Sequence, residues 1–140
     1  MRTRNLVLAI ALVLAIPVIL LGCSKGESAA KTDSQAYEDT LKGFLSAYDS
    51  GNYDKCFTYM LGMSSASAGA RDAMKTGLSV GHGGTGDIKV TKIENISIGQ
   101  SSATADVTYI VQGHTLTQPT TLYKEGDSWK VDFEKLWPSG

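Results

Sequence analysis

The side chains most able to do chemistry in this 140-residue chain are those of two cysteines and two histidines. His82 and His114 lie 32 positions apart, so the short His and Cys spacings that bind metals are missing, and we expect no metal or cofactor. Cys56 is expected to be a buried, inert thiol, because cysteine packs as a small hydrophobe. Cys23 closely follows an apolar run from Leu6 to Leu21, and this placement points to processing rather than catalysis.

The first 22 residues have the organisation of an export signal. Arg2 and Arg4 form a short basic leader ahead of the apolar run. The run closes in Leu20-Leu21-Gly22-Cys23, which resembles the lipobox of bacterial lipoproteins, in which the cysteine thiol carries a diacylglycerol and a signal peptidase cuts before it. The resemblance implies a signal peptide at residues 1–22 and a lipidated Cys23 as the mature N-terminus. It also implies a lipid-anchored protein on the extracytoplasmic face of the cell membrane or the outer membrane.

A transmembrane helix and a plain secretory signal are the alternatives. The apolar run has 16 residues, about 24 Å as a helix, whereas a membrane span needs about 20 residues to cross about 30 Å. Pro17 also interrupts the run, so an uncleaved signal anchor is the weaker interpretation. A plain secretory signal favours a small residue where Leu20 stands. We therefore expect the anchor to be lipid, since two or three acyl chains hold a protein on a bilayer.

Removal of residues 1–22 leaves 118 residues, enough for one domain with one core. The leader takes two of the 13 basic residues with it, so 11 basic and 14 acidic residues give the mature chain a charge of −3. A mildly acidic surface argues against nucleic acid as a partner. Residues 23–34 are polar and without periodicity, which predicts a lipidated cysteine followed by a flexible tether, with the folded domain at residues 35–140.

Three helices are predicted in the first half of the domain. The first runs from about Ser34 to Asp49, and its apolar residues fall at helical spacing. These are Tyr37, Leu41, Phe44, Leu45 and Tyr48. Asn52 can cap a short helix from Tyr53 to about Leu61, with one face made of Tyr53, Cys56, Phe57 and Met60. A weaker segment from about Ser65 to Thr76 would turn Ala66, Ala70, Ala73 and Met74 inward.

The glycine-rich stretch Gly77–Gly86 is predicted to be a flexible connector. A phosphate-binding loop would follow a strand and open a helix, whereas this stretch follows a helix and precedes a strand, and the lysine of such loops is absent.

Four strands are predicted after Asp87. In the first, the alternation slips between Val90 and Ile93, which indicates a β-bulge. The second has the clearest alternation, with Ala103, Ala105, Val107, Tyr109 and Val111 on one face. Pro119 favours an edge or a bulge in the third strand, from about Thr115 to Tyr123. A hairpin at Glu125-Gly126-Asp127 leads to the last strand, in which Trp129, Val131 and Phe133 share a face. Leu136-Trp137-Pro138 is expected to fold an aromatic ring back onto the domain.

Helices followed by a meandering antiparallel sheet give an α+β fold. The segment Phe44–Lys55 resembles the phrase that opens nuclear transport factor 2-like domains, and Ser102–Val107 with Leu122–Asp132 resembles their closing strands, as found in small bacterial lipoproteins with a domain of unknown function. The resemblance covers about residues 35–133 and rests on phrases that encode packing rather than chemistry. It implies a curved, cone-shaped sheet of about four strands wrapped around the long first helix, in a cystatin-like α+β arrangement.

Some members of that superfamily are isomerases or dehydratases that place an Asp or His with tyrosines inside the cone. The candidates here are Asp106, Asp132, His82, His114 and Tyr109. Strand alternation puts Asp106 on the face opposite Tyr109, and it turns Asp132 away from Trp129. Both histidines fall in turns. We therefore expect solvated carboxylates and turn histidines rather than a catalytic pair, because acid–base catalysis needs a titratable group held among apolar walls.

These observations favour a membrane-anchored binding domain without catalytic residues, whose partner is a small apolar ligand or a protein. A small hydro-lyase or isomerase that uses the cone pocket is the alternative, and an envelope assembly or scaffold component is a further one. Homodimerisation through the sheet is compatible with each. The candidates for the pocket or the core are Tyr37, Leu41, Phe44, Tyr48, Tyr109, Trp129 and Phe133.

Overall fold

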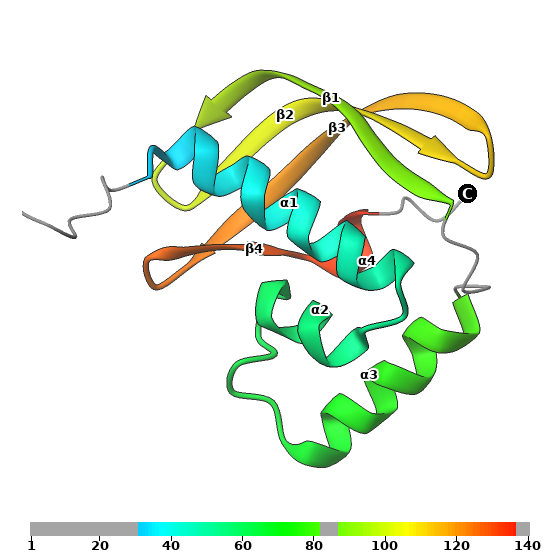
Figure 1. Cartoon of the computed structure of the whole chain (residues 1–140). Helices are drawn as coiled ribbons and strands as arrows, with labels where there is room; N and C mark the ends of the chain where they lie inside the picture. The colour runs from blue at the N-terminus through cyan, green and yellow to red at the C-terminus, as the bar shows by residue number, and fades with distance from the viewer. Residues whose placement is uncertain (1–30, 82–86, 137–140) are drawn as a thin grey trace, which may run out of the picture.

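A computed structural model describes residues 31–81 and 87–136, so Cys23, His82 and Trp137 lie outside the described residues. The elements in chain order are α1 (Asp33–Asp49), α2 (Tyr53–Tyr59), α3 (Ala68–Gly81), β1 (Ile88–Ile98), β2 (Ser102–Val111), β3 (His114–Glu125), β4 (Ser128–Val131) and α4 (Phe133–Leu136) (Figure 1). The strands pair in antiparallel fashion in the order β1-β2-β3-β4. The predicted α+β fold, with helices packed on a four-stranded antiparallel sheet, is confirmed.

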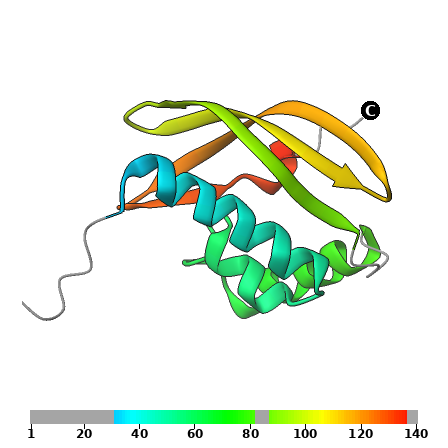
Figure 2. The ribbon, with the colours of Figure 1, turned by 45° about the horizontal axis from the view of Figure 1, so that its top comes forward.

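The sheet curves around α1, which contacts β1 and β4, the two outer strands (Figure 2). α1 begins at Asp33, two residues before the predicted domain boundary, because Thr32 caps it. The Thr32 hydroxyl accepts a hydrogen bond from Gln35 N at 3.3 Å, and the Gln35 side chain accepts one from Thr32 N at 3.2 Å. This reciprocal capping box satisfies two backbone donors that a helix start leaves free. The end of the predicted tether is therefore part of the helix.

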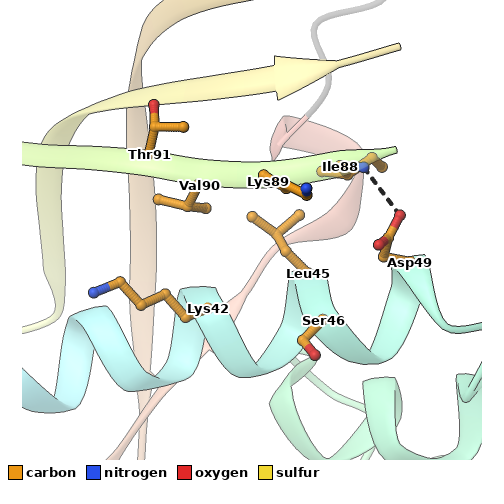
Figure 3. A pocket seen from close by; sticks show the side chains of 8 residues that line it. All are labelled: Lys42, Leu45, Ser46, Asp49, Ile88, Lys89, Val90 and Thr91. Atoms are coloured by element: carbon orange, nitrogen blue, oxygen red, sulfur yellow. Dashed lines mark hydrogen bonds between the residues drawn. The ribbon is translucent and has the colours of Figure 1, made fainter. Parts of the chain in front are cut away.

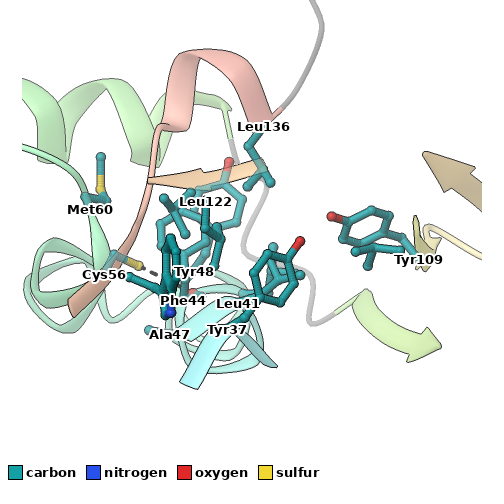
Figure 4. Packing of buried hydrophobic residues seen from close by; sticks show 14 of the residues in the cluster. Tyr37, Leu41, Phe44, Ala47, Tyr48, Cys56, Met60, Tyr109, Leu122 and Leu136 are labelled. Carbon is teal, nitrogen blue, oxygen red and sulfur yellow. Dashed lines mark hydrogen bonds between the residues drawn. The ribbon is translucent and has the colours of Figure 1, made fainter. Parts of the chain in front are cut away.

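Buried side chains of α1, α2 and the sheet form one hydrophobic core (Figure 4). The helical stripe of α1 and the inward face of β2 are buried as predicted. Of the seven predicted pocket or core residues, six are buried in this core: Tyr37, Leu41, Phe44, Tyr48, Tyr109 and Trp129. The seventh, Phe133, is half-buried and packs against the core. These residues therefore build the domain's interior.

α2 also follows its prediction. The Asn52 side chain accepts a hydrogen bond from Lys55 N at 3.2 Å and so caps the helix. Cys56 is 0% exposed, and its thiol donates to the Phe44 carbonyl at 3.9 Å. Burial raises the pKa of the Cys56 thiol to about 11, which disfavours the reactive thiolate. The prediction that Cys56 is buried is confirmed.

α3 differs from its prediction at both ends. It begins later and runs through Gly81, so the first part of the predicted flexible connector is helical. Leu78 explains the extension, because it is only 1% exposed and joins the hydrophobic core. The predicted inner face is wrong in part, since Ala70 and Ala73 are exposed while Met74 is half-buried.

The irregularities predicted in the sheet are present. The register between β1 and β2 shifts between Val90 and Lys92, and again between Glu94 and Ser97, which confirms a bulged first strand. β4 pairs with β3 only from Leu122 onward. Pro119 therefore lies in the part of β3 that pairs with β2 alone within the described sheet, where its missing N–H costs no ladder bond on the open side.

The last predicted strand is shorter than expected. β4 ends at Val131, and the Asp132 carbonyl accepts from Lys135 N and Leu136 N, both at 3.1 Å, which starts the short helix α4. Trp129 and Val131 share the buried face as predicted. The placement of Phe133 on that strand is wrong, because it lies in α4, where its ring centroid is 5.9 Å from that of Tyr48.

Candidate functional site

The interior of the domain holds a hydrogen-bonded group of polar side chains between α1 and the sheet. The Tyr37 hydroxyl donates to the Thr120 carbonyl at 2.7 Å, and the Tyr109 and Thr120 hydroxyl oxygens lie 2.6 Å apart. Burial raises the pKa of both tyrosines above the ordinary value, so both phenols stay protonated near neutral pH. Tyr37 and Tyr109 thus act as neutral hydrogen-bonding groups that tie α1 to β2 and β3.

The described acid–base candidates lie apart from these tyrosines. Asp106 is on the outer face of the sheet, where its carboxylate accepts from the Asn95 side chain at 2.8 Å. Asp132 forms an ion pair with Lys135 at 3.2 Å. His114 is exposed at the start of β3. Asp106, Asp132 and His114 therefore lie apart from Tyr109. Strand alternation predicts this separation for Asp106 and Asp132.

The side-chain types that bind metal ions in other proteins do not cluster in the described part of this chain. Within the described ranges 31–81 and 87–136, His, Cys, Asp and Glu side chains form no cluster of three or more that could hold a metal ion. No helix in these two ranges has the length and apolar character needed to cross a membrane.

A groove lies between α1 and β1, with a volume of about 350 Å³ (Figure 3). Its wall on α1 consists of Lys42, Leu45, Ser46 and Asp49, which repeat at helical spacing on one flank of the helix. Its wall on β1 consists of Ile88, Lys89, Val90 and Thr91. The groove thus combines apolar side chains with two lysines and two hydroxyls.

The backbone of β1 is oriented by two hydrogen bonds at the start of the groove. Asp87 O accepts from Gln112 N at 3.3 Å, on the β2 side. Ile88 N donates to the Asp49 carboxylate at 3.0 Å, on the α1 side (Figure 3). Successive strand residues direct their N–H and C=O groups to opposite sides, so Val90, like Ile88, directs its backbone groups away from β2.

Both lysines of the groove have exposed side chains. Lys42 makes an ion pair with Glu38 at 2.8 Å, one turn earlier in α1, and such exposed pairs contribute at most about 1 kcal/mol. Lys89 lies on β1 opposite Ile110 of β2, which places it toward the outer face of the sheet. The groove residues were not among the predicted site residues. The signal in the sequence was the slipped alternation after Val90, which marks an irregular strand but does not show what lies beside it.

No protein-family model matches the chain, and no curated protein matches it. A solved structure from Campylobacter jejuni, named as an NTF2-like transpeptidase, is similar over 68% of this chain and 95% of that chain. The two share 21% sequence identity, with a TM-score of 0.47. At this identity and TM-score, the likeness says nothing of what the present chain binds or catalyses.

Proposed function

We propose that this protein is a lipid-anchored extracytoplasmic binding protein whose domain captures a partner in the groove between α1 and β1. The observation that carries the proposal is the composition of that groove. Leu45 and Val90 offer apolar contact, while Ser46, Asp49 and the two lysines supply polar and charged groups at the rim. The Thr91 hydroxyl donates to the Thr108 carbonyl at 3.2 Å. Binding sites commonly combine apolar surface with a few polar groups that orient the ligand.

The polar interior supports a binding role over acid–base catalysis. Proton transfer requires a side chain with a pKa near the working pH beside the reacting group. Burial shifts the pKa of Tyr37 and Tyr109 upward, away from neutrality, and the Tyr37 hydroxyl donates to the Thr120 carbonyl. The interior tyrosines therefore suit a structural role, and the groove is the better place for a ligand.

The anchor is proposed from the sequence. Leu20-Leu21-Gly22-Cys23 ends a basic and apolar leader, and only seven residues lie between Cys23 and Lys31, the first described residue. Seven residues reach at most about 25 Å even when fully extended, so the lipid would hold the domain close to the membrane surface. A partner would then be another component of the cell envelope or a ligand near the membrane.

Mass spectrometry of the membrane fraction tests the anchor. We expect a mature chain that begins with an acylated Cys23, and a Cys23→Ser variant that is neither cleaved at this position nor acylated. A mature form that begins at another residue and is released by salt washing would contradict the proposed anchor.

A ¹H–¹⁵N NMR screen of the mature protein against fragments and short peptides tests the groove. Ligands should shift the amide signals of Leu45 and residues 88–91 and leave those of Tyr37 and Tyr109 nearly unchanged. Ser46→Trp should block these shifts by filling the groove, whereas Ser79→Trp, on the exposed side of α3, is the matched control and should not. Ligands that shift only the interior tyrosines would contradict a binding site in the groove.

A further inference from the structure

β1 is the outer strand of the described sheet, and the groove follows its open side. Ile88 and Val90 direct their backbone groups toward this side, as the hydrogen bonds of Asp87 and Ile88 show. An edge strand whose backbone groups have no partner strand is a template for one more strand, and here α1 runs along that side of β1. The groove therefore offers backbone hydrogen bonds as well as side-chain contacts.

The Asp49 side chain shows that the N–H groups on this edge can donate to an oxygen acceptor. Its carboxylate oxygen lies 3.0 Å from Ile88 N, where a carbonyl oxygen of a neighbouring strand would otherwise accept. Asp49 thus closes the first position of the edge, at the C-terminal end of α1. The next outward residue along β1 is Val90, beside Leu45 and Thr91 in the groove.

Edge strands are often protected from other chains by lysines and bulges, and β1 carries both. Lys89 is exposed on the edge strand, and the first bulge follows Val90. However, a lysine repels a basic strand and attracts an acidic one. Lys42 on the α1 wall is a second lysine beside the groove and also pairs with Glu38 at 2.8 Å, while the one carboxylate of the lining, Asp49, is hydrogen-bonded to the strand backbone.

We propose that the occupant of the groove is an extended, acidic segment of a partner protein, which adds to β1 as a further strand. This proposal rests on the proposed function of the groove. Residues of the added strand that face α1 would be apolar, because they meet Leu45 and the inward side chains of Ile88 and Val90. Residues that face the other way would be acidic, because they lie beside Lys89. The recognised pattern is a short alternation of apolar and acidic residues, with main-chain bonds giving affinity and alternate side chains giving specificity.

Fluorescence anisotropy with the mature lipoprotein in non-ionic detergent tests this proposal. The probe is a blocked, dye-labelled hexapeptide of alternating Val and Glu, and the comparison peptides replace Glu by Lys or Gln. We expect the acidic peptide to bind at least tenfold more tightly than the basic one, with the glutamine peptide between them. Binding should weaken as salt is raised, because the lysines are exposed to solvent.

Two sets of variants separate strand addition from charge attraction alone. Peptides N-methylated at alternate residues lose the N–H groups along one edge, so one of the two methylation frames should abolish binding and the other should preserve it. Lys89→Glu should weaken the acidic peptide at least tenfold and strengthen the basic one, whereas Lys55→Glu, on exposed α2 surface, should change affinity less than twofold.

Equal binding of both methylated frames, or an unchanged affinity in Lys89→Glu, would overturn strand addition of an acidic segment. If none of the peptides binds while a fragment still shifts the amides of the groove, the proposed function stands and this proposal falls. If neither peptides nor fragments reach the groove, both fall.

Discussion

Replacement of Trp129 offers the sharpest test of how β4 closes the core. Its side chain is 3% exposed and shares the inner face of β4 with Val131. Trp129→Ala should lower the free energy of unfolding by about 3–5 kcal/mol, because truncation of a buried aromatic removes its apolar contacts and leaves a cavity. That loss is a large part of the stability of a small domain.

The indole nitrogen of Trp129 gives a second, finer expectation. Its Nε1–H is buried and has no hydrogen-bond partner among the described residues. A buried donor without a partner costs about 1–3 kcal/mol. Trp129→Phe removes this donor together with part of the ring, and the two effects oppose each other. We therefore expect Trp129→Phe to change the free energy of unfolding by only about 1 kcal/mol, despite the loss of ring volume.

Lys124 supplies the matched control, because its ammonium lies 5.1 Å from the centroid of the Trp129 ring. Lys124→Met keeps the aliphatic stem and removes the charge together with its 3.9 Å ion pair to Asp33, and should cost about 0.5–1 kcal/mol, as a half-exposed cation–π contact does. Urea unfolding of the mature chain, followed by circular dichroism, measures all three variants. A loss below about 1 kcal/mol in Trp129→Ala would refute the burial argument, and an equal loss in Trp129→Phe and Trp129→Ala would show that Nε1 has a partner.

Three further predictions concern the interior. Tyr37→Phe should cost about 1–3 kcal/mol in urea unfolding, because it leaves the buried Thr120 carbonyl without its 2.7 Å donor; no measurable cost would show that water replaces the phenol. Burial raises the pKa of the Cys56 thiol to about 11, so the unfolded chain loses this proton at lower pH than the folded one. The free energy of unfolding should therefore fall as pH rises from about 9 to 11. Cys56→Ala should flatten that fall in melts between pH 8 and 11. Leu78→Ala should speed amide hydrogen exchange throughout α3 while leaving β2 protected, and uniform exchange would argue against Leu78 as the anchor of α3.

The elements that the sequence predicted well are those whose burial pattern follows a single period. α1 buries Tyr37, Leu41, Phe44 and Tyr48 on one stripe, and β2 alternates between partly exposed and buried residues up to Tyr109, with Val111 half-buried at its end. In both, each residue's environment depends on its position within one element. The bulge after Val90 is also a local feature, and the slipped alternation sufficed to predict it.

The errors lie where a distant contact overrides a local preference. Glycine disfavours helix by about 1 kcal/mol per residue, which favoured a connector after residue 76. Burial of Leu78 against the core stabilises the helix through Gly81 instead, and no local pattern announces that contact. Phe133 continues the alternation of β4, yet the bonds to the Asp132 carbonyl turn the chain into α4 and bring its ring toward Tyr48.

The groove lay beyond prediction for a different reason. Lys42, Leu45 and Asp49 lie about 40 residues from Ile88 and Val90, and they meet only because α1 crosses the sheet beside its outer strand. A meander places β1 at one edge of the sheet, but no pattern in the sequence shows that α1 lies beside that edge. Once α1 is known to lie beside β1, the hydrogen bond from Ile88 N to Asp49 gains a meaning that the sequence could not give it. This bond fixes which residues of β1 present their backbone to the groove. N-methylation of a bound peptide should therefore have its largest effect at the peptide residue that pairs with Val90.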